Sequence, residues 1–422
     1  MYSIIKKSQF IKNITLLLSG NIFGQLIPII ASVILTRLYS PDDFAVLAYF
    51  LIITSIISVI AGGRYELAIM LPEDEKKAKT LYVISLIFNV SISGIVALVC
   101  YLFGSGFAAL FNAEILIGYL YLIPFSIFFV GLYQSANNYA NRLSKYKLMS
   151  STVICRSVFT SGSNIALGFA GFTNIGLIIG TLVGQFIGAL ILSINIIKEL
   201  ISDFPSTSMI KSTIIEYKDF PLKNGISMFF NLLANQIPIL LIGYFFQNNT
   251  IVGWYALVLR VLNLPLMTIG KSVSQVFYQE TNQSEKNNQL NLFIKTSKGL
   301  FVLIIIPAII LLFAGPFLFK FIFGAEWEDA GIIAQIFILF YIVRFVFSSQ
   351  STLLISNKKL KTELLFNVVF FISQISCVIL GYKMGNYFYS FIFMSVAGFI
   401  QFSILGLILY NSSKLINDKK NN

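Results

Sequence analysis

Four basic side chains lie inside stretches that are otherwise apolar enough to cross a lipid bilayer: Arg156, Arg260, Lys271 and Arg344. A charge in hydrocarbon costs about 3 kcal/mol or more unless it faces a partner or water, so intramembrane charge indicates a functional site. Arg260 lies about 12 Å along its expected helix at 1.5 Å per residue. Arg156 is comparably deep from the cytoplasmic side, and Arg344 lies nearest the middle of the membrane. The Lys271 amine, by contrast, can reach the inner headgroups.

Arg64 lies near the end of another apolar segment, with Glu66 two residues further on. We expect the helix to continue to Leu71 and to keep Arg64 inside the protein. The alternative is that Arg64 reaches the headgroups and that Glu66 pairs with loop lysines.

No Asp or Glu lies clearly in the middle of an expected span. The buried cations therefore await an anion from elsewhere, and a phosphate or an acidic sugar suits the planar guanidinium fork. We predict anion binding for Arg64, Arg156, Arg260 and Arg344. Tethering of these side chains to backbone carbonyls or amides remains the structural alternative.

Uncharged polar side chains also occur within the spans, where they could hydrogen-bond sugar hydroxyls or a cation, or join helices. The candidate lining residues are Asn21, Gln25, Asn231, Asn235 and Gln236. The order Ser40-Pro41-Asp42-Asp43 predicts a helix N-cap more than a metal-binding acidic pair. The absence of His excludes His-based catalysis, and we expect no catalytic residue, metal or cofactor.

The composition identifies an integral membrane protein. Hydrophobic residues make up 57% of the 422 residues and charged residues only 11%, too few polar groups to cover a soluble globule of this size. The net charge of +12 comes from small basic clusters in the loops, which suits anionic lipid headgroups and not nucleic acid. The three cysteines lie far apart within apolar segments and predict neither a disulfide framework nor a metal site.

Runs of about 20 apolar residues predict twelve transmembrane helices. They span 14–38, 44–71, 80–103, 115–137, 148–169, 175–197, 225–246, 252–277, 299–319, 331–354, 364–382 and 387–410. When Arg64, at the end of the second span, is counted with the connection that follows it, 23 of the 30 Lys and Arg residues lie in one alternating set of connections, the termini included. The positive-inside rule therefore places both termini in the cytoplasm.

The twelve spans fall into two matching halves. We expect six-helix lobes at 1–200 and 221–422, separated by a polar cytoplasmic linker at 201–220. Gln25-Leu26-Ile27-Pro28 in the first span is echoed by Gln236-Ile237-Pro238 in the seventh. Because each half has an even number of spans, the halves should relate by a pseudo-twofold axis along the membrane normal, with a cationic central cavity.

Several runs together resemble the polysaccharide-transport branch of the multidrug/oligosaccharidyl-lipid/polysaccharide (MOP) flippase superfamily. They are Leu17-Leu18-Ser19-Gly20, Gln25-Leu26-Ile27-Pro28, the segment 35–44, the segment 63–72, Asn141-Arg142, Lys218-Asp219-Phe220-Pro221 and the segment around Arg260. The resemblance implies translocation of undecaprenyl-pyrophosphate-linked O-antigen or capsule units from the cytoplasmic to the periplasmic leaflet. We expect the two lobes to do this by rocking between two states in an alternating-access cycle. The resemblance also implies a bacterial inner-membrane location, cavity-lining roles for Arg64, Arg260, Arg156 and Arg344, and an unidentified coupling ion. A polymerase and a chain-length regulator are candidate partners, and the sequence alone does not decide whether they join the protein.

Two other functions are consistent with a multi-pass membrane protein of this composition. A polysaccharide polymerase or ligase would act on the same substrate, but such enzymes need a substantial periplasmic loop, and the expected outer loops are minimal. A small-molecule exporter of the multidrug and toxin extrusion (MATE) type favours an acidic or aromatic cavity, which is opposite to the charge pattern found here.

Overall fold

The computed structural model describes residues 2–110, 114–201, 204–218, 220–221, 226–283, 289–357 and 359–418, and within these ranges all regular secondary structure is helical, without a strand. Twelve helices of 17 residues or more follow the expected spans in order. They are α1 (Tyr2–Leu38), α2 (Pro41–Ser58), α4 (Glu75–Leu110), α5 (Ile123–Arg142), α6 (Tyr146–Phe169), α7 (Asn174–Ile201), α9 (Ile226–Phe246), α10 (Asn249–Pro265), α12 (Gln289–Phe323), α13 (Glu328–Ser348), α15 (Leu360–Lys383) and α16 (Tyr387–Asp418). The all-helical membrane fold with twelve long helices is therefore confirmed.

Ten helical segments of the described chain are long and apolar enough to cross a membrane. The two other long helices are α9, whose apolar part is the shorter stretch Asn235–Phe246, and α6. α6 carries Arg156 and many Ser, Thr and Asn residues, among them Ser157, Thr160 and Asn164, which lower its hydropathy. Its length of 24 residues nevertheless suffices to span a bilayer.

The second span ends earlier than the apolar pattern predicts. α2 stops at Ser58, and the short helix α3 (Tyr65–Ala68) follows after a turn, so the expected continuation to Leu71 is wrong. Gly63 and Arg64 both have positive φ angles, of 61° and 62°. An α-helix cannot continue through two left-handed residues, and hydropathy does not register that constraint.

The start of α2 is a capping box, as Ser40-Pro41-Asp42-Asp43 predicts. The Asp43 backbone N–H donates to Ser40 Oγ at 3.3 Å, and the Ser40 N–H donates to Asp43 Oδ2 at 2.9 Å. Asp42 and Asp43 thus lie in the first turn of α2, where Asp43 completes the capping box and the helix dipole favours negative charge.

The chain divides into two compact units, Met1–Leu232 and Leu233–Asn422. In the first unit, α4 packs on α5, α5 on α7, α6 on α7 and α2 on α5. In the second unit, the helices that correspond to them in order form the same four pairs: α12 with α13, α13 with α16, α15 with α16, and α10 with α13. This correspondence indicates that the two halves repeat one packing scheme.

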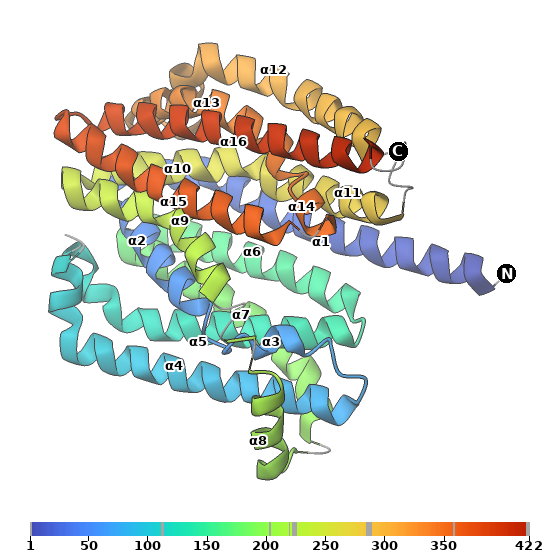
Figure 1. Cartoon of the computed structure of the whole chain (residues 1–422). Helices are drawn as coiled ribbons and strands as arrows, with labels where there is room; N and C mark the ends of the chain where they lie inside the picture. Colours follow the sequence, from blue (N-terminus) through green and yellow to red (C-terminus); the bar gives the residue numbers. More distant parts are fainter. Residues whose placement is uncertain are drawn as a thin grey trace. The chain divides into compact units, whose positions relative to one another are not determined.

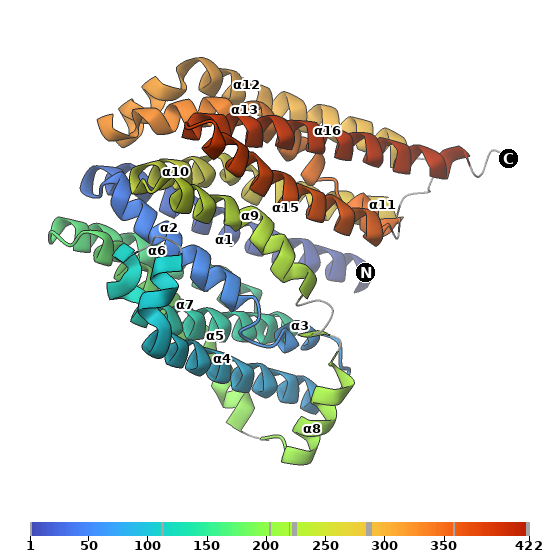
Figure 2. The ribbon, with the colours of Figure 1, turned by 60° about the vertical axis from the view of Figure 1, so that its left-hand side comes forward.

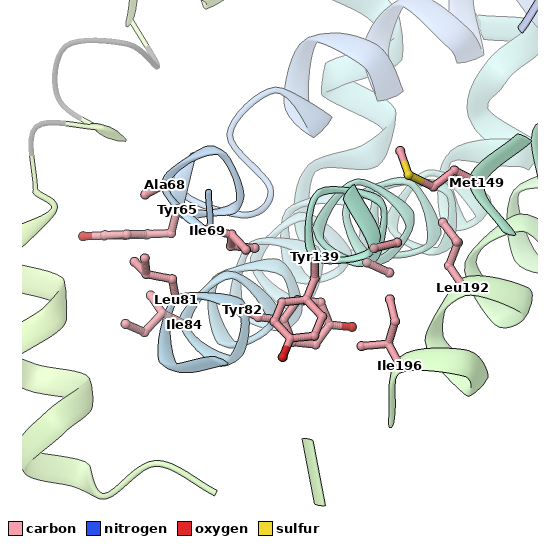
Figure 3. Packing of buried hydrophobic residues seen from close by; sticks show 12 residues of the cluster. Tyr65, Ala68, Ile69, Leu81, Tyr82, Ile84, Tyr139, Met149, Leu192 and Ile196 are labelled. Carbon is pink, nitrogen blue, oxygen red and sulfur yellow. The ribbon is translucent and has the colours of Figure 1, made fainter. Parts of the chain in front are cut away.

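The polar linker belongs to the first unit. Its helix α8 (Thr207–Glu216) packs against α4 (Figures 1 and 2). Figure 3 shows the buried cluster that Tyr65, Tyr82 and Tyr139 form with aliphatic neighbours. Ile210 and Ile214 on α8 are partly buried and pack against this cluster. Lys77 on α4 pairs with Glu216 at 3.0 Å.

Shorter elements complete the second unit. α10 continues through a π-helical turn, η3 (Leu266–Gly270), into α11 (Lys271–Gln283). Pro265 lies at this junction; because proline removes a backbone donor, the hydrogen-bond register shifts here. The 3₁₀ turns η1 (Glu114–Leu122) and η5 (Ala325–Trp327) precede α5 and α13, and α14 (Thr352–Ser356) follows α13.

Candidate functional site

α6 carries Arg156 and packs against α7 along a row of glycines. Gly180, Gly184 and Gly188 recur every four residues on α7. A Cβ atom added at these positions would meet Asn164, Thr160 and the aliphatic stem of Arg156, respectively, on α6. Small residues at this spacing let two membrane helices approach closely. The glycine row therefore holds the stem of Arg156 against α7.

The Arg156 guanidinium lies over the ring of Tyr133 on α5, 5.1 Å from the ring centroid. A cation over an aromatic face gains about 0.5–2 kcal/mol, depending on how far it is desolvated. The cationic guanidinium of Arg156 is thus stabilised by the face of a neutral ring.

Asn21 and Gln25 lie on α1, which packs along α6. The Ser157 hydroxyl, next to Arg156, donates to the Gly24 carbonyl at 2.6 Å. Both amide side chains are partly buried, and Gln25 Oε1 is buried with no hydrogen-bond partner in the described part of the chain. A buried amide oxygen of this kind is available to a ligand hydroxyl or water.

Arg64 lies in the turn between α2 and α3, and its environment corrects the sequence interpretation. Its Nη1 atom lies 3.8 Å from Glu66 Oε1 and donates to the Val59 carbonyl at 3.4 Å. The Glu66 side chain is only 2% exposed. The expectation that no buried carboxylate stands near these cations is therefore wrong for Arg64, as is the pairing of Glu66 with loop lysines. Burial raises the pKa of Glu66, and the Arg64 charge opposes that rise.

Arg344 lies on α13 within a cage of aromatic rings. Its guanidinium carbon is 5.6 Å from the Phe340 centroid, 5.4 Å from that of Tyr341 and 5.8 Å from that of Phe402 on α16. Its Nη2 atom donates to Asn235 Oδ1 on α9 at 3.1 Å. The structure thus brings together a predicted cation and a predicted lining amide.

Arg260 lies partly buried on α10 in the same unit. The Tyr341 hydroxyl donates to Asn263 Oδ1 at 3.4 Å. Asn263 is one turn from Arg260, and Tyr341 is one turn before Arg344, so this hydrogen bond joins the two arginine-bearing helix faces. Together with Asn235, these residues form the candidate anion site of the second unit.

Two of the predicted lining residues, Gln236 and Asn231, remain to be placed. Gln236 is partly buried on α9. Asn231 lies in the same helix, but its side chain falls outside the described residues.

The sequence interpretation missed the aromatic residues around the cations. Phe340 and Tyr341 precede Arg344 by four and three residues, so they share its helix face, and this spacing was readable in the sequence. Tyr133 and Phe402 come from other helices and carry no such local signal.

Comparison with known proteins places the chain in a family. The family model described as polysaccharide biosynthesis protein matches residues 34–332. A search of curated protein sequences finds no significant match.

Several solved transporters share the fold. An inward-facing MATE multidrug resistance transporter of the MOP superfamily has a TM-score of 0.73 at 14% identity, covering 93% of this chain and 96% of its own. The lipid II flippase MurJ, in an inward closed conformation, has a TM-score of 0.72 at 17% identity, covering 96% and 90%. A MOP superfamily transporter from Pyrococcus furiosus, described as having a binding pocket of reverse polarity, has a TM-score of 0.59 at 13% identity and covers 96% of each chain.

The apolar helices establish a multi-pass membrane protein, and its fold is that of MOP superfamily transporters. With the family model covering most of its length, the chain belongs to the polysaccharide biosynthesis protein family.

Proposed function

We propose that this protein is a flippase that moves undecaprenyl-pyrophosphate-linked oligosaccharide units, of O-antigen or capsule type, from the cytoplasmic to the periplasmic leaflet of the bacterial inner membrane. Membership of the polysaccharide biosynthesis family and a fold shared with a lipid II flippase support this proposal. The basic loops support an orientation with both termini in the cytoplasm.

One observation carries the choice of an anionic substrate. Arg344 and Arg156 lie within long helices and contact aromatic rings and, for Arg344, the Asn235 amide. A guanidinium stacked on a ring keeps most of its N–H donors in its own plane, where a phosphate can accept two of them. Arg260 on the neighbouring face adds a second cation to the same unit.

The physical task of such a protein is to shelter a charged, hydroxylated head group. Moving a pyrophosphate and several sugars through hydrocarbon without partners is prohibitively costly. We propose that the arginines hold the pyrophosphate, that amides such as Gln25 and Asn235 hold sugar hydroxyls, and that the polyprenyl tail stays in lipid. Alternating access by the two repeated halves then requires no covalent chemistry. A polymerase and a chain-length regulator are the expected partners.

Deletion of the gene followed by analysis of lipid-linked glycans tests the proposal. A flippase defect leaves single lipid-linked units on the inner leaflet, whereas a polymerase or ligase defect leaves them exported but not polymerised. Export of normal polysaccharide by the deletion strain would refute the proposal.

Point variants test the assignment of the arginines. Arg64→Ala and Arg260→Ala should lose surface polysaccharide while protein abundance stays normal, and Lys at either position should rescue partly because it keeps the charge without the fork. Arg344→Ala and Arg156→Ala should behave likewise. Lys320→Ala is a matched control, because Lys320 is an exposed cation paired with Glu328. Wild-type polysaccharide display by the alanine variants would remove these residues from the site.

The likeness to MATE transporters makes a small-molecule exporter the second candidate. It differs in the charge of its cargo, since a cationic compound needs aromatic or acidic partners, whereas the rings at these sites already hold arginines. Loss of resistance to cationic compounds in the deletion strain, with normal surface polysaccharide, would favour it.

A further inference from the structure

The first unit carries an apolar groove along α4. Its volume is about 510 Å³, within the range of about 300–1,000 Å³ that small-molecule sites have. α4 lines it between Val83 and Ser91, and Ile197 of α7 and Phe204 of the linker complete the lining. Apart from Ser91, the lining side chains that the structure describes are apolar. This lining suits a hydrocarbon chain and not the charged head group of the proposed substrate.

The groove has about the depth of one membrane leaflet. α4 begins at Glu75, at an end for which the basic loops favour a cytoplasmic location. At 1.5 Å per residue, Val83 and Ser91 lie about 12 Å and about 24 Å along the helix from that residue. The groove therefore extends for about 12 Å, close to the roughly 15 Å that one leaflet contributes to the hydrocarbon core. A single acyl chain of the inner leaflet matches this length.

The face of α4 that lines the groove becomes basic toward the expected cytoplasmic end. At 100° per residue, Lys76 and Lys79 fall about 20° and about 40° from Val83 around the helix, so they continue the same stripe. Lys76 is exposed. The Lys79 amine is 3.8 Å from the exposed carboxylate of Glu75, which is beyond hydrogen-bond distance. Two ammonium groups at the end of an apolar groove match the phosphate and the acyl chain of an anionic phospholipid.

The other charged residues near this end of α4 lie off the stripe. Glu73 and Asp74 precede the helix. Lys77 falls about 120° from Val83 around the helix, and its amine pairs with Glu216 on α8 at 3.0 Å. The stripe that leads into the groove is therefore basic, and the carboxylate of the linker helix is engaged by a lysine outside that stripe.

The linker beside the groove exposes large apolar side chains. Phe204, three residues after the end of α7, is 71% exposed, and Ile215 on α8 is 65% exposed. The opposite side of α8 packs on the protein, because Ile210 and Ile214 contact the buried cluster. Apolar side chains on a helix that also carries a cation, here Lys211, are typical of segments that lie at the boundary between headgroups and acyl chains.

We propose that this groove binds one anionic phospholipid of the inner leaflet. An acyl chain lies along α4 between Val83 and Ser91, and the headgroup phosphate accepts hydrogen bonds from Lys76 and Lys79. Phe204 contacts the chain, so the bound lipid joins the linker to α4 and stabilises the first unit. The choice of leaflet rests on the proposed orientation of the protein, whereas the site itself does not depend on flippase activity.

The lysines determine which lipid is preferred. Surrounding acyl chains are as apolar as the groove, so entering it from the bilayer gains little hydrophobic free energy. Each lysine near an anionic surface strengthens binding by about fivefold. Removal of both should therefore weaken the binding of an anionic lipid by about 25-fold and should change the binding of a zwitterionic lipid little.

Native mass spectrometry of the full-length protein tests the site, with phosphatidylglycerol and phosphatidylcholine of the same acyl chains added in equal amounts to the detergent. The wild type should retain one phosphatidylglycerol in preference to phosphatidylcholine. The double variant Lys76→Gln/Lys79→Gln should lose this preference. Val90→Trp, which fills the groove and leaves the lysines in place, should weaken phosphatidylglycerol binding as well.

Two matched variants separate the groove from general attraction to the membrane. Lys147→Gln removes an exposed cation at the start of α6, on the same expected side of the membrane. Ile95→Trp adds the same ring on α4 at a position that is 60% exposed and about 120° from Val83 around the helix. Both should retain phosphatidylglycerol as the wild type does. Phosphatidylglycerol should also raise the melting temperature of the wild type more than that of Val90→Trp, because a ligand of the folded state stabilises it.

Several results would overturn the assignment. They are equal retention of the two lipids by the wild type, unchanged phosphatidylglycerol binding in the lysine and Val90 variants, and equal losses in the Lys147 and Ile95 controls. Displacement of phosphatidylglycerol by equimolar undecaprenyl phosphate would instead assign the groove to a polyprenyl tail. A protein dimer that Val90→Trp dissociates would assign it to a second copy of the chain. Each of these results leaves the flippase proposal intact, and normal glycan export in the deletion strain would refute that proposal without affecting the lipid site.

Discussion

The glycine row of α7 yields a sharp prediction about how Arg156 is positioned. At Gly184, a Cβ atom would collide with the Thr160 side chain and would lie 2.9 Å from the Arg156 carbonyl oxygen. The carbonyl is backbone and cannot rotate away, so Gly184→Ala must push α6 and α7 apart. Because α6 also packs on α1, the displacement changes the place of the Arg156 guanidinium over Tyr133.

The size of the effect follows from two opposing contributions. Overpacking of a tight contact costs about 1–3 kcal/mol, while Ala in place of a helical Gly gains up to about 1 kcal/mol from backbone entropy. Gly162 on α6 is the matched control, because a Cβ added there meets nothing within 4 Å. Gly162→Ala carries the same entropy gain without the clash, so the two variants should differ by about 1–3 kcal/mol in the free energy of unfolding.

Thermal unfolding of both variants in the same detergent, with surface polysaccharide measured in complemented deletion cells, provides the assay. Gly184→Ala should unfold at a lower temperature than Gly162→Ala and should export less polysaccharide. Equal melting temperatures for the two variants would show that α6 and α7 are not held at this distance, and the account of Arg156 would fail with it.

Three other predictions concern single residues. Burial raises the pKa of Glu66, so the contribution of Glu66 to stability falls as the pH rises above the ordinary Glu range. The melting temperature of Glu66→Gln should therefore depend less on pH above that range than the melting temperature of the wild type, and a wild-type pH profile in the variant would contradict this. Ser40→Ala should lower the free energy of unfolding by about 1 kcal/mol through loss of the α2 cap, whereas Ser40→Gly should cost only a few tenths, and equal costs for both would argue against the capping box. Asn235→Asp should place a carboxylate at Arg344, keep or raise the melting temperature and reduce polysaccharide export; unchanged export would show that Arg344 does not bind the substrate.

The helices were predictable because hydropathy and length alone decide which segments can cross a bilayer. Their order and their two matching halves follow from the same runs of apolar residues. The end of α2 was not predictable in this way, because the break depends on the left-handed backbone at Gly63 and Arg64 and not on polarity. A Gly-Gly pair before a charged residue is a turn signal that deserves more weight than a following apolar run.

The cations of the site were predictable, but their partners were only partly so. Charge inside apolar segments identified Arg156, Arg260 and Arg344, and Asn235 was selected as a polar residue in a span. The Tyr133 ring lies 23 residues from Arg156 and Phe402 lies 58 residues from Arg344, so only the packing of different helices brings these rings to the cations. Glu66 was visible in the sequence, yet its burial depends on the glycines that make room for it.

The contrast between Arg64 and Arg344 explains how one chain can use arginines in two ways. A carboxylate is the strongest competitor for an incoming phosphate, since both accept hydrogen bonds from the same guanidinium fork. Arg344 is held by rings and one amide, so an anion can bind without displacing a charge. Arg64 faces Glu66, so an anion that binds there must leave a buried carboxylate without its counter-charge. Arg344 is therefore suited to holding a substrate anion, while Arg64 can bind an anion only by giving up its contact with Glu66.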